Sequence, residues 1–329
     1  MSETNQSTTT HECLSQRFWD DAEHRIHIRA IGGTVVCATG LICNYLSFII
    51  LRRMYSSVVA TYYLLSILAV VDSIYLVLSF CYYNLSDLNG LWKFGFINYH
   101  YLDPVLLAPY PRYYTSVAQL TGKMYRNWLI AMISIERWLQ LSFPLKSRAL
   151  ITPKRCKFAV VGLFCFCFIT HAYHWHFIIL KSVYNDCPLF NRMMLGQAVH
   201  SDGQVISRLM NITFIVAMPF IFLSITNIAL IRILIKATSR RKKISQSSSV
   251  GTGDMQATML ALSSVIIYLI CESPTIADRI LIMVGIRNMY LSPLKPVLSQ
   301  VDSCVNFFLY CLSSAKFRRI FSNTFCKYR

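Results

Sequence analysis

The sequence predicts an all-α membrane protein, a bundle of seven transmembrane helices followed by a short amphipathic eighth helix. Of its 329 residues, 55% are hydrophobic and only 14% are charged, and the mean hydropathy is +0.45, which is too apolar for a soluble chain of this length. Seven apolar segments are each long enough, at about 1.5 Å per residue, to cross a hydrocarbon core of about 30 Å. The connections between these segments alternate between strongly and weakly basic.

The distribution of charge predicts the orientation in the membrane. The net charge is +17, but the Lys and Arg residues lie in short segments between apolar runs, so we expect no nucleic-acid partner. The first, third and fifth connections and the C-terminus are the basic ones, and the positive-inside rule places them in the cytoplasm. We therefore expect a plasma-membrane protein with an extracellular mobile tail at 1–29, a seven-helix domain at 30–313, and a cytoplasmic amphipathic helix and C-terminus at 314–329.

The N-terminal tail is polar, rich in Ser and Thr, and has no apolar core of its own. Two acceptor sequons, at Asn5 and Asn84, fall on the expected outer side, and both are predicted glycosylation sites. The expected spans that follow the tail are 30–51, 58–83, 111–140, 157–180, 206–235, 256–284 and 293–313.

Most of the twelve cysteines lie inside apolar runs, where a free Cys behaves as a small hydrophobic residue. No Cys-x-x-Cys pair with metal-ligand spacing is present, and Cys165 and Cys167 fall on different helix faces. The cluster of His171, His174 and His176 has poor ligand geometry on a helix and lies near a membrane boundary. We therefore expect no metal site, no cofactor and no enzyme.

Polar residues inside the spans are costly unless they face the bundle interior with a partner, so each is a candidate functional residue. The simpler interpretation of Asn44 is a hydrogen bond between helices, and that of Asp72 with Arg126 is a structural ion pair. Pro219 and Pro274 each remove a backbone hydrogen bond and are expected to bend their helices. The polar core predicted on this basis consists of Asn44, Asp72, Arg126 and Asp302, with Lys123 and Glu272 as further charged residues in the spans.

Several residues occur in a fixed order along the spans. They are Asn44, Asp72 at the end of LAVVD, Glu136-Arg137-Trp138 followed by Pro144, Pro219, Cys271 with Pro274, and Asn306 to Tyr310 in NFFLY. In this order they resemble the markers of rhodopsin-class (class A) G-protein-coupled receptors over residues 30–326, and AKFRRIF is similar to the eighth helix of that family. Within the family, DSCVNFFLYCLSSAKFRRIF and a Cys-x-x-Pro motif without Trp are most similar to invertebrate neuropeptide receptors of the FMRFamide type.

The sequence also departs from the pattern of that family. Trp138 stands where Tyr is usual, Glu272 where the sixth helix has Trp, and Phe307 where the seventh has Pro. Arg126 stands where a Ser commonly helps Asp72 to hold sodium, so we expect the Arg126 guanidinium to occupy the place of that ion.

The resemblance implies a disulfide at Cys187 in the second outer loop. The usual partner on the third helix is absent, so Cys81 is the first candidate and Cys13 the second, and a free Cys187 stays open.

The resemblance further implies a latch at the inner end of the third helix, although a Glu-Arg pair alone indicates only a solvated helix end. Arg137 is expected to pair with Glu136 and with Asp254 in the resting state, and Asn306 and Tyr310 to take part in activation. A ligand that favours tilting of the sixth helix would open a cleft for a heterotrimeric G protein.

The expected ligand is an extracellular peptide. Monoamine receptors of this family need an Asp where this chain has Gln119. Glu272 is expected to hold an Arg near the end of a short amidated peptide of the FMRFamide type. The alternatives are a divergent receptor with a non-peptide ligand and a channel or transporter, which no inverted repeat or ring of acids supports. The expected ligand-binding residues are Gln119, Lys123, Tyr113, Glu272 and Arg279.

Overall fold

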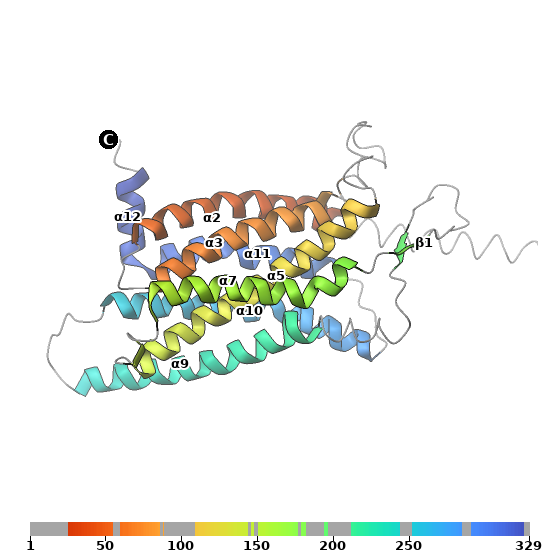
Figure 1. Ribbon diagram of the computed structural model, residues 1–329. Coiled ribbons are helices and arrows are strands. Elements are labelled where there is room, and N and C mark those ends of the chain that lie inside the picture. The colour runs from red at the N-terminus through yellow and green to blue at the C-terminus, as the bar shows by residue number, and fades with distance from the viewer. Residues whose placement is uncertain are drawn as a thin grey trace, which may run out of the picture.

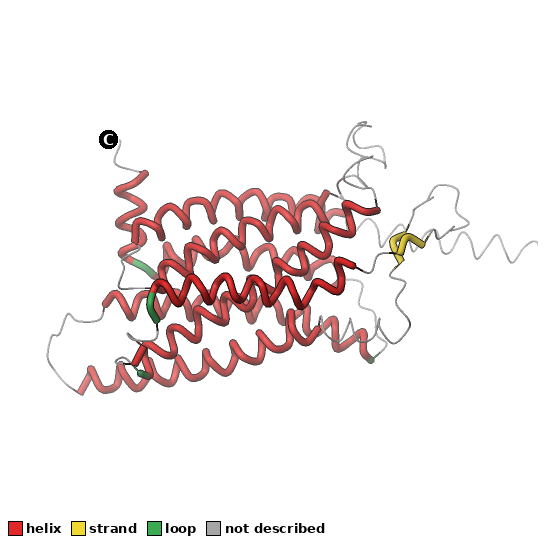
Figure 2. Tube along the Cα trace, in the orientation of Figure 1, coloured by secondary structure: helices red, strands yellow, loops and turns green. Residues whose placement is uncertain are grey.

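The computed structural model describes residues 26–54, 60–85, 88, 109–143, 146–147, 151–176, 179–181, 194–196, 212–243, 252–284 and 291–325. Within these residues, seven long helices pack into a bundle and a short eighth helix follows the last of them (Figure 1 and Figure 2). Apart from one small hairpin, the predicted all-α bundle with its short eighth helix is confirmed.

The helices alternate in direction along the chain (Figure 1). One end of the bundle carries β1 and the other carries α12, and we refer to these as the β1 end and the α12 end. The described helices, with η marking π-helical segments, are η1 (Ile26–Gly33), α2 (Thr34–Met54), α3 (Ala60–Ser79), η2 (Phe80–Asn84), α5 (Pro109–Ser142), α7 (Pro153–His176), η3 (Ile212–Ala217), α9 (Met218–Lys243), α10 (Thr252–Met283), α11 (Leu291–Ser313) and α12 (Ala315–Phe325).

The fourth span ends earlier than the sequence predicts. Its expected range was 157–180, but α7 ends at His176, and β1 (Ile179–Lys181) pairs antiparallel with β2 (Met194–Gly196). Leu180 lies opposite Leu195 in this hairpin. Short apolar runs of this kind suit a strand as well as a helix, so hydropathy alone does not locate the boundary.

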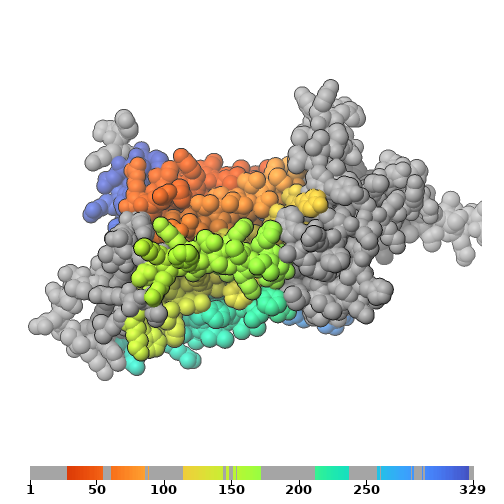
Figure 3. Space-filling model, viewed as in Figure 1, coloured from red at the N-terminus to blue at the C-terminus, as the bar shows by residue number. Residues whose placement is uncertain are grey.

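The outer surface of the bundle is apolar. In Figure 3, α7 lies along the face turned to the viewer, and its Phe158 and Ile169 side chains are 79% and 70% exposed. Such exposure is unfavourable in water and suits contact with lipid. Among the described residues, three helical stretches are long and apolar enough to cross a membrane by length and composition alone, namely Ile28–Met54, Thr61–Asn84 and Ile212–Lys236.

Close packing joins α2 to its neighbours at Gly40, which is fully enclosed. A Cβ atom placed on Gly40 would lie 2.6 Å from Cδ1 of Leu76 on α3 and 3.2 Å from Cβ of Cys304 on α11. The first distance is shorter than real Cβ contacts and the second is tighter than most of them, so glycine lets these three helices approach closely. At Gly32, in contrast, an added Cβ would meet nothing within 4 Å.

The break in the fifth span is satisfied by a neighbouring helix. Pro219 lacks the N–H group that would bond to the carbonyl oxygen of Ile215 in a regular helix. Instead, Nδ2 of Asn127 on α5 donates to that oxygen over 2.8 Å. One residue earlier, Nε1 of Trp128 donates to the carbonyl oxygen of Phe214 over 3.0 Å. Two side chains of α5 therefore hold η3, the π-helical segment that leads into α9.

Candidate functional site

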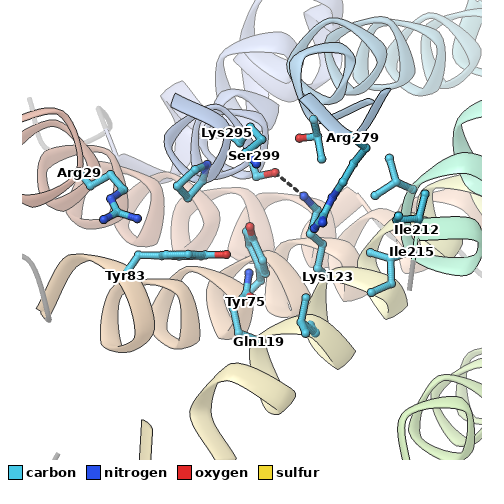
Figure 4. A pocket seen from close by; sticks show the side chains of 14 residues that line it. Arg29, Tyr75, Tyr83, Gln119, Lys123, Ile212, Ile215, Arg279, Lys295 and Ser299 are labelled. Carbon is cyan, nitrogen blue, oxygen red and sulfur yellow. Dashed lines mark hydrogen bonds between the residues drawn. The ribbon is translucent and has the colours of Figure 1, made fainter. Parts of the chain in front are cut away.

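A cavity of about 250 Å³ lies at the β1 end, between η1, α3, η2, α5, η3, α10 and α11 (Figure 4). At about 30 Å³ per water molecule, this volume holds about eight waters, or one large side chain. Three predicted ligand-binding residues line it, namely Gln119, Lys123 and Arg279. Tyr113 belongs to α5, but its side chain lies outside the described residues.

Lys123 and Ser299 form the floor of the cavity, and with Glu272 beneath them they make a hydrogen-bonded triad that joins three helices. Nζ of Lys123 on α5 lies 2.9 Å from Oε1 and 3.0 Å from Oε2 of Glu272 on α10. Ser299 on α11 accepts from Lys123 over 2.8 Å and donates to Glu272 over 2.5 Å. A buried pair with this additional hydrogen bond is well compensated for its loss of hydration.

The position of Glu272 differs from the one expected for a ligand contact. Its side chain is fully buried and is absent from the described lining of the cavity. Because Lys123 and Ser299 already satisfy both carboxylate oxygens, this geometry argues against a direct bond from Glu272 to an Arg of the ligand. Its charge instead orients Lys123, whose side chain is 11% exposed.

Several lining residues were not anticipated from the sequence, namely Arg29, Tyr75, Tyr83 and Lys295. Arg29 and Lys295 fall at the ends of expected spans, where basic residues normally mark the membrane interface. The only signal for Lys295 was its place between two prolines at the start of the seventh span. The tyrosines look like ordinary aromatic residues of an apolar run.

One step deeper, a buried charge network crosses the centre of the bundle. Nε of Arg126 donates to Oδ1 of Asp72 over 2.5 Å, and Nη2 of Arg126 is paired with Asp302. Asn306 donates to the second oxygen of Asp72 over 2.9 Å. Asn44 donates to the carbonyl oxygen of residue 303 over 3.0 Å. The structure thus gathers the predicted polar core, and the Arg126 guanidinium bridges the two acids.

At the α12 end, Arg137 and Glu136 form a buried pair. Nε of Arg137 lies 3.0 Å from Oε2 of Glu136, and the hydroxyl of Thr61 on α3 donates to the same oxygen over 2.5 Å. Gln140 donates to Oε1 of Glu136. Asp254, the other expected partner of Arg137, belongs to α10, and its side chain lies outside the described residues.

The seventh and eighth helices meet through aromatic packing. Phe307, which replaces the usual Pro, has its ring centroid 5.9 Å from that of Phe317 and 5.8 Å from that of Phe321, both on α12. Tyr310 is 1% exposed, and its ring centroid lies 5.6 Å from that of Phe317. The departure at Phe307 therefore has a structural role, because its ring holds α12 against α11.

The predicted modifications are N-glycosylation at Asn5 and Asn84 and a disulfide between Cys81 and Cys187. Asn84 is 1% exposed, and its Oδ1 accepts a 3.0 Å hydrogen bond from Gln300. Its burial argues against a glycan there, because glycosylation needs an accessible carboxamide, whereas Asn5 lies outside the described residues. Cys81 is a free thiol in the structure, and Cys187 lies outside the described residues, so the disulfide between them stays a prediction.

Among the described residues, no group of three or more His, Cys, Asp or Glu is placed to hold a metal ion.

These sites are connected along a single face of α5. The spacings of three or four residues, with one step of eight between Arg126 and Ser134, put its polar residues in one row. The row spans 18 residue steps, or about 27 Å at about 1.5 Å per residue, from the cavity to the α12 end. Its members are Gln119, Lys123, Arg126, Ser134 and Arg137, of which all but Lys123 are buried residues.

Comparison with known proteins gives a family match over most of the chain. Residues 33–327 match the family model described as "Serpentine type 7TM GPCR chemoreceptor Srw". The chain is 26% identical over 307 residues to the FMRFamide receptor of Drosophila melanogaster, covering 90% of this chain and 53% of that receptor. It is 24% identical over 205 residues to galanin receptor type 2 of Rattus norvegicus, covering 59% of this chain and 51% of that receptor. The chain spans about half the length of these curated relatives.

Proposed function

Because the chain belongs to the serpentine seven-transmembrane G-protein-coupled chemoreceptor family Srw, we propose that it is a plasma-membrane receptor that binds an extracellular peptide and activates a heterotrimeric G protein. The rhodopsin-class resemblance of the sequence agrees with the two receptors it matches. A chain of this family is a multi-pass membrane receptor and not an enzyme.

The observation that carries the proposal is the polar row on α5. At one end of the row, Lys123 forms the floor of a cavity, and at the other end Arg137 pairs with Glu136. Arg126 between them holds α3 and α11 together. A ligand that shifts Lys123 therefore acts on the same rigid element that carries Arg137 at the opposite end.

The element that would move is α10. Pro274 lies inside this helix, two residues after Glu272, and weakens its backbone hydrogen bonding there. In the proposed mechanism, ligand binding changes the Lys123–Glu272 pair and favours a state in which α10 tilts at this point. The tilt separates Asp254 from Arg137 and opens a binding surface for the G protein at the α12 end, which we assign to the cytoplasm.

A peptide ligand is supported by the shape of the site and by the names of the relatives. The cavity has room for about one side chain, so most of a peptide would lie outside it, toward the outer segments. The two relatives are named as receptors for FMRFamide and galanin. We accordingly propose a short amidated peptide, while a small non-peptide ligand that fits wholly inside the cavity is the second candidate.

A guanine-nucleotide exchange assay tests the proposal. Membranes from cells that express the full chain are screened with a panel of short amidated peptides, and at least one peptide should accelerate exchange. Arg137→Ala is the matched variant, because it leaves the cavity intact and should abolish the response. A ligand-dependent ionic current in the same cells, with no exchange under any peptide, would support the channel or transporter alternative instead.

A further inference from the structure

The described lining of the cavity is strongly cationic. Four of its residues are basic and none is acidic, and each of the four comes from a different helix. Arg29 belongs to η1, Lys123 to α5, Arg279 to α10 and Lys295 to α11. Cations gathered in an apolar surrounding raise the local concentration of anions, because a low-dielectric wall focuses their field.

Among the described residues, carboxylates pair with only part of this positive charge. Lys123 is paired with Glu272 below the floor, and Lys295 is paired with Asp278. Arg279 has no carboxylate partner in the part of the chain that the structure describes. Its side chain points into the cavity toward Lys123 (Figure 4). Two cationic groups that face one another across a cavity leave a place for an anion between them.

A second observation points to a polar ligand. Oε1 of Gln119 and Oγ1 of Thr275 have no hydrogen-bond partner within the described residues. Both side chains line the cavity, and the residues are only 2% and 6% exposed. An unsatisfied buried polar atom is costly, so a site that holds two of them is suited to a polar ligand. The Thr275 hydroxyl can donate to an anion, and the Gln119 oxygen can accept from an N–H or O–H group beside it.

We propose that this cavity binds an organic anion. The carboxylate or sulfate group of the ligand, carried by a small organic group, is held between Arg279 and Lys123. The binding step rests on the geometry alone, and its role as a receptor signal rests on the proposed function. The charge of this ligand is opposite in sign to the one expected from the sequence, which is a cationic group held by Glu272. Here Glu272 lies behind Lys123 and competes with the ligand for it.

This arrangement links occupancy to the bend in α10. An anion that bonds to Lys123 draws the ammonium group away from Glu272 and weakens the contact between α5 and α10. Glu272 is two residues before Pro274, so the contact is lost where α10 bends most easily. The anionic group is therefore the part of the ligand that favours the active state.

Direct binding to the purified full chain in lipid nanodiscs tests the site without a G protein. The probes are phenylacetate, its neutral isostere phenylacetamide and the cation phenethylamine, measured by saturation-transfer NMR. Phenylacetate should bind about tenfold more tightly than the other two, as expected for loss of a charged hydrogen bond. Equal binding of the three probes, or preferential binding of phenethylamine, would overturn the proposal.

Two variants with opposite expectations separate this site from a general loss of folding. Arg279→Gln should weaken phenylacetate binding by about tenfold, because it removes one of the two charges. Glu272→Gln should strengthen binding, because it frees Lys123, and no misfolded protein would do that. Lys154→Gln, on the exposed start of α7, is the matched control for a lost cation and should leave binding unchanged. Weaker binding in Glu272→Gln, with the wild-type melting temperature retained, contradicts the proposed competition.

The same assay keeps the two proposals apart and identifies the source of the anion. Phenylacetate binding without any nucleotide exchange would preserve the anion site and count against the receptor function. Exchange driven by neutral or cationic peptides, without phenylacetate binding, would do the reverse. In a matched pair of amidated peptides that differ only by Asp or Asn, stronger binding of the Asp form assigns the anion to a peptide side chain. Equal binding of that pair, with phenylacetate still bound, assigns it to a small acid.

Discussion

Nε of Arg126 lies 2.5 Å from Oδ1 of Asp72, and both side chains are fully buried between α5 and α3. The same guanidinium is paired with Asp302, so one cation balances two carboxylates in the centre of the bundle. Because one cation serves two carboxylates, loss of Arg126 should lower the stability of the protein more than loss of one carboxylate. The stabilities of single variants can be compared to measure this difference.

Arg126→Met should be far more destabilising than Asp72→Asn. The first change leaves two buried carboxylates without a cation, at a cost of about 3–5 kcal/mol. The second keeps the Arg126–Asp302 pair and loses about 1–3 kcal/mol of charged hydrogen bonding. Melting temperatures of the two variants in the same detergent check this order, and equal losses would contradict the central role of Arg126.

Asn127→Leu should destabilise the receptor by about 1–3 kcal/mol, because the carbonyl oxygen of Ile215 then loses the hydrogen bond from the Asn127 side chain. Pro219→Ala should partly restore stability in that background, since Ala supplies the N–H group that Pro lacks. The measurement is a double-mutant cycle on thermal unfolding. Simple additivity of the two changes would show that Asn127 does not compensate for Pro219.

Gly40→Ala should cost about 1–3 kcal/mol through overpacking, because its Cβ would collide with Leu76 and Cys304. Gly32→Ala is the matched control, since an added Cβ meets nothing there. Surface expression and thermal stability of the two variants can be compared directly. Similar values for both would mean that α2 moves away from α11 without penalty.

Glu136→Gln should raise basal nucleotide exchange, because it removes the charge that holds Arg137 in its buried position. The effect should reach several-fold, as expected for loss of one charged hydrogen bond of about 1.5–3 kcal/mol, part of which is retained by the amide. Thr61→Val serves as the control, since it removes the hydroxyl at Glu136 but leaves the ion pair in place. Exchange must be compared at equal surface expression.

Asp254→Asn should also raise basal signalling if the carboxylate of Asp254 holds Arg137 in the resting state. Second-messenger levels in unstimulated cells provide the measurement, with the wild-type chain at the same surface density as reference. An unchanged level would assign the latch to Glu136 alone.

Much of the fold follows from the sequence, because the lengths of apolar runs and the alternation of basic connections can be read directly from the order of the residues. The prediction of the fold from the sequence fails only at particular boundaries. The boundary after His176 was missed, since a run of bulky apolar residues forms a strand there as readily as a helix. The ion pair of Asp72 with Arg126 could be predicted from the sequence, because two opposite charges in apolar spans have few other possible partners.

The site itself was less predictable, because sequence gives the face of a helix but not the order of contacts across the bundle. Glu272 was recognised as functional, yet only the geometry places it behind Lys123. Arg29 and Lys295 were missed because basic residues at span ends are common. The role of Phe307 in docking α12 could be seen only in the structure. A changed motif position shows that the usual residue is absent, but it does not show which contacts the new side chain makes.

The cations of α5 also have a consequence for synthesis of the chain. Lys123 and Arg126 would each cost about 2.5–3.5 kcal/mol at the centre of a helix that enters the bilayer alone. Of their carboxylate partners, Asp72 is translated before α5, whereas Glu272 and Asp302 follow much later. We therefore expect α5 to leave the translocon together with α3, and to wait for α10 and α11 before it is fully neutralised. Nascent chains that stop short of α10 would expose this imbalance to the quality-control machinery of the cell.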